Sequence, residues 1–112
     1  MESRVTRYAN GPLPEHLEHA AYFTVDRKEW ALPKAEAILY LDWCEREDFK
    51  VLGFDVWYPT SPDPTVADLG IGNIEGIAAT LEGIQQHPGC DVYGPVVFNI
   101  WVVEHGSTPT AG

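Results

Sequence analysis

The sequence predicts a small two-layer sandwich, of class α+β or α/β, in which two main helices pack on one three-stranded sheet. Two observations predict it. The 112 residues, 45% of them hydrophobic, suit a single domain, and apolar patterns of strand and helix period alternate along the chain. The expected order is strand, helix, strand, helix, strand (β-α-β-α-β), and the sheet can be parallel or mixed. We expect the domain at residues 20–105, with an N-terminal arm at 1–19 and a flexible tail at 106–112.

The first strand and the first helix occupy residues 20–47. The segment 20–25 (AAYFTV) is short, apolar and rich in residues that favour strands. Pro33 suits the first turn of a helix, where its missing N–H is not needed, and this helix should run to about Glu47. Its expected core face, at helical spacing, is Ala37, Ile38, Leu41 and Cys44.

The second strand is the apolar segment 50–58 (KVLGFDVWY). Its alternating pattern predicts one more deeply buried face. That face contains Leu52, Phe54, Val56 and Tyr58. The segment 59–72 contains three prolines and two glycines, so we expect a long loop. Loops of this length in compact domains are often functional.

The second helix begins after Asn73, which can cap it, and the last strand is the segment 95–103 (PVVFNIWVV). The expected core face of the helix is Ile74, Ile77, Ala78, Leu81 and either Ile84 or Gln85. Gly76 and Gly83 each weaken this helix by about 1 kcal/mol relative to alanine, and we expect them to let it pack closely on the sheet. The last strand is apolar on both faces, which predicts a central position in the sheet.

The charge of the chain is strongly negative and unevenly distributed. Seventeen Asp and Glu residues oppose seven Lys and Arg, for a formal net charge of −10, and no Lys or Arg follows Lys50. A nucleic-acid-binding protein needs a basic face for phosphates, and anionic membranes attract basic segments, so both partners are disfavoured. Acidity of this kind attracts basic proteins. The alternative is that it only keeps the chain soluble and monomeric.

The sequence contains no pattern typical of an enzyme or a metal site. Cys44 and Cys90 lack metal-ligand spacing and are expected to be free thiols. His16 and His19 are three residues apart, but no third ligand follows at a recognisable spacing. The sequence also shows no secretory signal and no apolar run of about 20 residues. We therefore expect a cytoplasmic protein with no cofactor, no metal and no catalytic residues.

One surface feature predicts a partner-binding site on the first helix. Glu36, Tyr40, Trp43 and Glu47 follow one another at helical spacing, on the side opposite the expected core face. Aromatic anchors with charged neighbours are common in binding hot spots. We therefore expect these four residues to form an outward-facing stripe. The alternative is that the N-terminal arm folds over Tyr40 and Trp43 and buries them.

Two short segments resemble a family of bacterial immunity proteins that accompany polymorphic toxins. They are Trp30–Pro33 (WALP), before an Ala- and Glu-rich helix, and the strand Val51–Trp57 (VLGFDVW), so the resemblance covers residues 30–58. In the strand, Phe54 stands where the family has a glycine and Trp57 where it has a tyrosine. The resemblance implies a cytoplasmic immunity protein that binds and neutralises a cognate toxin protein.

The resemblance and the acidity together imply a basic toxin that contacts two patches. The first is the stripe of Glu36, Tyr40, Trp43 and Glu47, and the second contains Asp55, Trp57, Asp63 and Asp68, at the end of the second strand and in the loop that follows.

Two other hypotheses remain. One is a small-molecule-binding domain or an enzyme, with a pocket at the strand ends under the 59–72 loop. Its walls would be Trp57, Tyr58 and Trp101, with Asp55 and Asn99 pointing inward. The other is a homo-oligomer in which the outward aromatic side chains of two copies meet.

Overall fold

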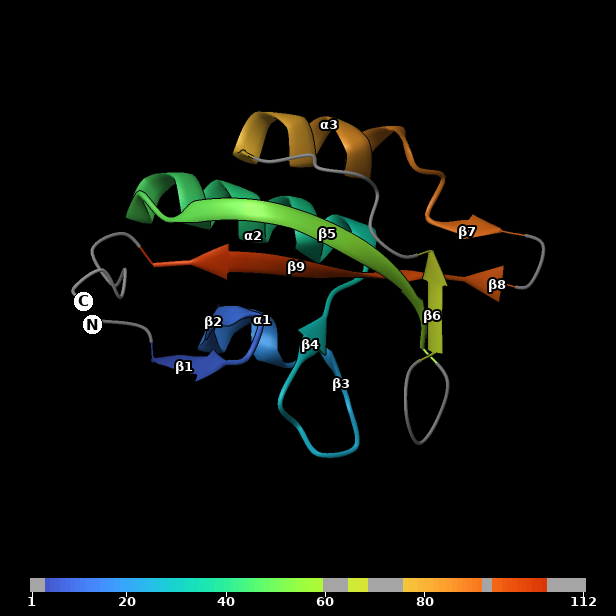
Figure 1. Cartoon of the computed structure of the whole chain (residues 1–112), viewed down its shortest axis with the longest axis horizontal. Coiled ribbons are helices and arrows are strands. Elements are labelled where there is room, and N and C mark those ends of the chain that lie inside the picture. The colour runs from blue at the N-terminus through green and yellow to red at the C-terminus, as the bar shows by residue number, and fades with distance from the viewer. Residues whose placement is uncertain (1–3, 60–64, 69–75, 92–93, 105–112) are drawn as a thin grey trace.

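The computed structural model describes residues 4–59, 65–68, 76–91 and 94–104 (Figure 1). Its elements, in chain order, are β1 (Val5–Tyr8), β2 (Gly11–Pro14), α1 (Glu15–Glu18), β3 (Tyr22–Phe23), β4 (Trp30–Ala31), α2 (Lys34–Glu47), β5 (Lys50–Tyr58), β6 (Thr65–Asp68), α3 (Ile77–Gln86), β7 (Cys90–Asp91), β8 (Gly94–Pro95) and β9 (Val97–Val103). The mixed α and β composition is therefore confirmed. The predicted tail at 106–112, and Asn73 and Ile74 of the predicted second helix, lie outside the described residues.

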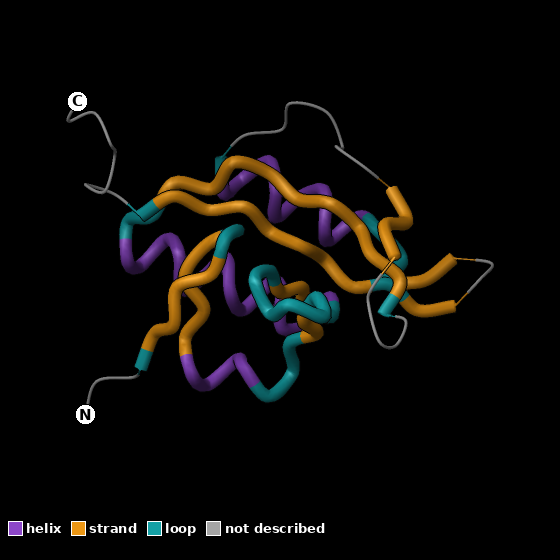
Figure 2. Tube along the Cα trace, turned by 60° about the horizontal axis from the view of Figure 1, so that its bottom comes forward, coloured by secondary structure: helices purple, strands orange, loops and turns teal. Residues whose placement is uncertain are grey.

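The described strands, which are orange in Figure 2, form four small antiparallel sheets rather than one. A three-stranded sheet has the order β6-β5-β9, and three two-stranded sheets contain β1 with β2, β3 with β4, and β7 with β8. The prediction of a single three-stranded sheet in β-α-β-α-β order is therefore wrong. The segment 20–25 contributes only β3, which pairs with β4 outside the three-stranded sheet. The segment 59–72, predicted as a loop, contains the strand β6.

The extra strand β6 explains why β5 and β9 are antiparallel. β6 runs back along β5, and the N–H of Gly76, just before α3, donates to the carbonyl of Val51 at 2.8 Å. α3 therefore begins beside the start of β5, and β9 begins at the far end, where Val97 lies opposite Trp57. A single helical crossover between β5 and β9 would instead have made them parallel.

β5 has the predicted bounds, but its buried face differs near its start. The pairing of β5 with β9 shifts register between Val51 and Gly53, so Leu52 is a bulge residue. Val51 is consequently buried in the same cluster as Phe54, whereas Leu52 is 37% exposed. One inserted residue reverses the alternation of faces, so the two-residue period predicts the wrong side for Leu52.

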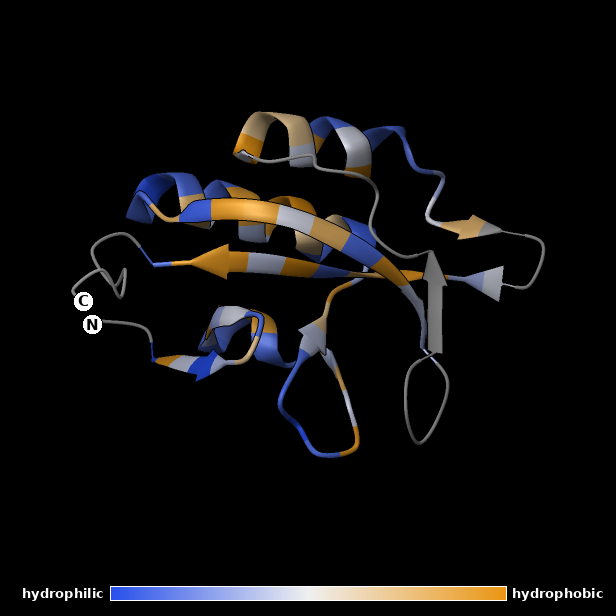
Figure 3. Ribbon diagram, viewed as in Figure 1, coloured by the Kyte–Doolittle hydropathy of each residue, from blue (hydrophilic) through white to orange (hydrophobic). Residues whose placement is uncertain are grey.

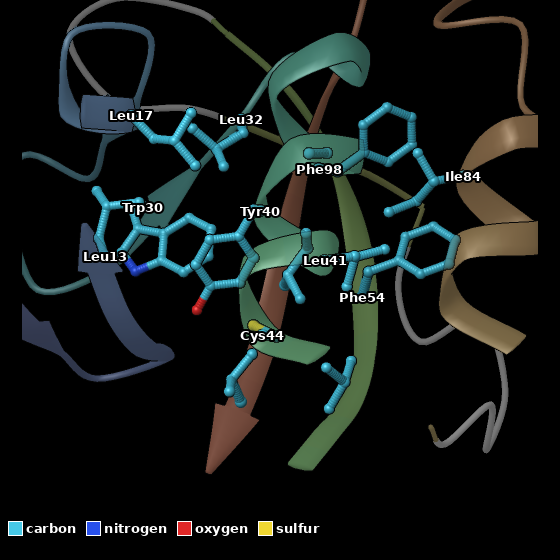
Figure 4. Packing of buried hydrophobic residues seen from close by; sticks show 14 of the residues in the cluster. Leu13, Leu17, Trp30, Leu32, Tyr40, Leu41, Cys44, Phe54, Ile84 and Phe98 are labelled. Carbon is cyan, nitrogen blue, oxygen red and sulfur yellow. The ribbon is translucent and has the colours of Figure 1, made fainter. Parts of the chain in front are cut away.

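The main core lies between α2 and one face of β5 and β9. Figure 4 shows α2 crossing these two strands, with the N-terminal segment on one side of it and α3 on the other. The buried cluster includes Leu41 of α2, Phe54 of β5, and Phe98 and Ile100 of β9. Complete burial of one such side chain contributes about 1.5–3 kcal/mol. α2 is therefore held on several sides, and not only by the sheet.

α3 packs on the sheet through a glycine and is attached to α2 at its end. A Cβ atom at Gly83 would lie 3.0 Å from the ring of Phe54, so the predicted close packing is confirmed at this position. Gly76 differs, because it lies in open space with a φ of +102° that glycine adopts readily. Lys34 of α2 donates from Nζ to two carbonyls at the C-terminal end of α3, at 3.0 and 2.7 Å.

Residues 4–19, predicted as an N-terminal arm, contribute two buried side chains to the core. β1 and β2 pair with each other, and the side chains of Leu13 and Leu17 are buried. Figure 4 places both leucines beside α2, on the side away from α3. Prolines are tolerated in edge strands, so Pro12 and Pro14 did not prevent β2 from forming.

A buried asparagine connects this N-terminal segment to β4 and β9. Asn10 is 0% exposed. Its Nδ2 donates to the carbonyls of Ile100 (2.7 Å) and Trp30 (3.1 Å), and its Oδ1 accepts from the N–H of Trp30 at 3.1 Å. The carbonyl of Asn10 accepts from the N–H of Val102 at 2.8 Å. One residue thus satisfies buried backbone groups of two strands, which cannot reach water.

Replacing Asn10 by alanine should lower the free energy of unfolding by about 3 kcal/mol or more. The N–H of Trp30 and the carbonyl of Ile100 would stay buried without this partner, at about 1–3 kcal/mol each. Urea-induced unfolding measures the change. The control is Thr6→Ala, which removes an exposed hydrogen bond to Glu18 and should change stability by less than about 0.5 kcal/mol. Similar losses in both variants would mean that the buried amide has no special role.

Thr80 on α3 presents the opposite case. Its hydroxyl is buried and has no hydrogen-bond partner in the described part of the chain. Thr80→Val keeps the branched shape and removes the unpaired polar group, so we expect the free energy of unfolding to rise by about 1 kcal/mol. Thermal denaturation should give a higher midpoint for Thr80→Val and a lower one for Thr80→Ser. A valine variant that melts below the original chain would contradict this expectation.

Candidate functional site

The predicted aromatic stripe on α2 is not on the surface. Tyr40 is fully buried and donates from Oη to the carbonyl of Pro12 at 2.6 Å, and Trp43 is only 8% exposed. The prediction of an outward-facing stripe is therefore wrong, and the alternative, in which the N-terminal segment covers Tyr40, is confirmed. Glu36 is half-buried and Glu47 is exposed, so only the two acids of this stripe reach solvent.

Burial in this part of the core also changes the pKa values of Tyr40 and Cys44. Tyr40 contacts the rings of Trp30 and Trp43, with centroids 4.7 and 5.6 Å apart. Burial raises the pKa of Tyr40 well above its ordinary value. Burial likewise raises the pKa of the Cys44 thiol to about 12. Cys44 is therefore a protonated core residue at neutral pH and not a nucleophile.

The second predicted patch is only partly accessible in the described residues. Trp57 is buried in a small cluster with Ala31 and Val97, separate from the main core. Asp55 is half-buried and lies opposite Asn99 in the pairing of β5 with β9. Asp68 pairs through its backbone with Val56, and Asp63 lies outside the described residues.

A row of polar side chains crosses β5 and β9 on the face of the sheet away from α2. Asn99 donates from Nδ2 to the carbonyl of Trp30 at 2.9 Å, and its Oδ1 accepts from Nε1 of Trp101 at 2.6 Å. Burial, followed by the charges of Asp26 and Asp55, raises the pKa of Glu29 above its ordinary value of 4.5, although a hydrogen bond from Asn99 opposes this change. Glu29, Asp55, Asn99 and Trp101 therefore form a connected polar row.

Within this row, the Asn99 amide is already satisfied by the protein. Both ends of the Asn99 amide are occupied by groups of the protein itself, which is typical of a structural role. Three hollows among the described residues have other walls. One, of about 180 Å³, lies beside the ion pair of Arg7 with Glu104, and another, of about 220 Å³, lies at the turn between β3 and β4.

The largest of these hollows is a groove between α2 and α3, of about 290 Å³. Its apolar walls are Ile38, Leu41, Ile77, Ala78 and Leu81. Asp42 and Glu45 of α2 form an acidic edge, and both are exposed. Figure 3 shows that the N-terminal part of α3, on the other side, is hydrophobic. The groove was not predicted, because it requires two helices that are distant in sequence to lie side by side.

Substituting Glu29 by glutamine should change how stability depends on pH. Because the pKa of Glu29 is raised in the folded state, the folded chain holds this proton more tightly than the unfolded chain. The stability contributed by protonated Glu29 is complete below the ordinary pKa and is lost as pH rises through the raised pKa. Glu29→Gln should therefore unfold at higher urea concentration than the original chain at neutral pH, and this difference should vanish below about pH 4.5.

The control for this measurement is Glu15→Gln, an exposed acid on α1. Its stability difference from the original chain should not follow the same pH dependence. A Glu29→Gln difference that is constant with pH would show that the carboxylate is not responsible.

In the described ranges, no three His, Cys, Asp or Glu side chains lie together in a group that could hold a metal ion. Within those ranges, no helix combines the length and the apolar character needed to cross a membrane. Comparison with models of protein families, with curated proteins and with solved structures found no significant match.

Proposed function

We propose that this chain is a cytoplasmic immunity protein, which binds a basic cognate toxin through the acidic surface of its helical layer. The observation that carries the proposal is the charge of that layer. α2 and α3 together contain five acids, Glu36, Asp42, Glu45, Glu47 and Glu82, against two bases, Lys34 and Arg46. The surface formed by the two helices is therefore negative.

Both bases of this layer already have partners within the protein. Lys34 donates to carbonyls at the end of α3, and Nε of Arg46 lies 3.2 Å from Oδ2 of Asp42. The Arg46 pair is exposed at both ends, and such surface pairs contribute roughly 0–1 kcal/mol. A basic partner can therefore displace Arg46 from Asp42 at little cost.

An acidic surface suits an inhibitor of a protein that acts on nucleic acid. Such a toxin needs a basic surface for phosphate groups, and an acidic inhibitor is complementary to that surface. Complementary charge increases the rate of encounter and disfavours wrong partners. The resemblance of residues 30–58 to immunity proteins supports the same function. Its first segment covers β4 and the N-cap of α2, and its second lies within β5.

The direct test is to express the product of the gene immediately upstream, or its C-terminal part, with and without this chain. We expect the product alone to arrest growth and the pair to grow normally. The two proteins should also co-purify at equal stoichiometry. A harmless upstream product that does not bind this chain would contradict the proposal.

Neutralising the acidic edge should slow binding to the toxin. We expect the double variant Asp42→Asn with Glu45→Gln to reduce the association rate constant by about tenfold at low salt, with a smaller difference at high salt because salt screens exposed charges. Surface plasmon resonance at two salt concentrations measures this. The charge-matched control is Glu15→Gln with Glu18→Gln on α1, which packs on β2. Equal slowing by both double variants would place the contact elsewhere.

A further inference from the structure

We infer that the groove between α2 and α3 receives one amphipathic helix of the toxin, with its apolar side on the groove floor and its Lys or Arg residues toward Asp42 and Glu45. This inference rests on the proposed function and specifies the part of the partner that binds. Figure 1 shows α2 and α3 side by side over the sheet, and the groove lies between these two helices.

The floor of the groove offers apolar contact area, but its volume is small for a pocket that encloses a whole small molecule. Leu41 at the bottom is buried, while Ile38, Ile77 and Leu81 are half-buried and Ala78 is exposed. The volume of about 290 Å³ is at the lower limit of small-molecule pockets, which measure roughly 300–1,000 Å³. It suits apolar side chains inserted at helical spacing, as in other helix-in-groove complexes.

The two walls of the groove differ in charge, and this difference orients the ligand. Asp42 and Glu45 are three residues apart, so both lie on the same side of α2. The facing residues of α3, Ile77, Ala78 and Leu81, are uncharged. A ligand that is apolar below and basic on one side is therefore complementary, whereas an acidic or purely polar helix is not.

Apolar surface continues past the acidic edge. Leu39 is 55% exposed and lies three residues before Asp42 on the outer side of α2. A second copy of this chain would bring two acidic edges together, which repel each other. The charge of the groove thus favours a basic partner over self-association.

The first experiment uses two synthetic peptides of identical leucine and lysine composition, each about 18 residues long, which gives about five helical turns. One has the order of an amphipathic helix and the other is scrambled. We expect the amphipathic peptide to bind at least about tenfold more tightly than the scrambled peptide. Its NMR shift changes should be centred on Ile38, Ala78 and Leu81. Equal binding of both peptides, or no binding of either, would overturn the inference.

Two neighbouring alanines provide a matched pair of variants. Ala78 lines the groove, whereas Ala79 does not, and both are exposed, so lysine at either position should leave the fold intact. Ala78→Lys should weaken binding of the amphipathic peptide by about tenfold or more, by filling the groove and opposing the ligand's charge. Ala79→Lys, with the same change in net charge, should weaken it much less. Equal losses of affinity in the two variants would show that only total charge matters. Dimers of this chain, detected by light scattering without peptide, would instead assign the groove to a second copy.

The same pair of variants separates this inference from the proposed function. If the original chain and Ala78→Lys neutralise the toxin equally well, the function stands and the groove is not the contact. If the amphipathic peptide binds in the groove but the upstream product is neither toxic nor bound, the groove stands and the immunity function is wrong.

Discussion

The buried side chain of Asn10 is the contact on which the packing of the other elements depends. β9 pairs with β5 along one edge. On its other edge, Leu32 exchanges two backbone hydrogen bonds with Phe98, and the carbonyl of Asn10 accepts from Val102. The Asn10 amide satisfies the carbonyl of Ile100, which lies between these two points. The second edge of β9 is thus closed by short segments of different sheets, and the side chain joins them.

This contact also determines which side of α2 is free. Asn10 holds the backbone of Trp30, whose ring packs against Tyr40. The N-terminal segment therefore covers one side of α2, and the sheet covers another. The side toward α3 remains open at the groove, where Asp42 and Glu45 reach solvent. The position of the proposed binding surface is in this sense a consequence of the core.

The groove combines two kinds of interaction that act at different stages of binding. Exposed carboxylates at its edge act over a distance and mainly raise the rate of association. The apolar floor acts only on contact, and contributes about 25 cal/mol for each Å² removed from water. Lys34 cannot neutralise the edge without releasing the end of α3. The exposed pair of Arg46 with Asp42 neutralises only part of the edge and contributes little energy, so a basic partner can supply the remaining opposite charge.

The sequence by itself determined what depends on neighbours along the chain: the bounds of β5, a helix after Pro33, the need for glycine at position 83, and the excess of acids. Only the tertiary structure decided which helix faces are buried. Helical spacing favours burial of Leu41 but does not show that Tyr40 is buried as well, because the burial of Tyr40 depends on Pro12, far away in the sequence. Contacts such as Asn10 with Ile100 follow from the complete packing of the chain, and no local pattern encodes them.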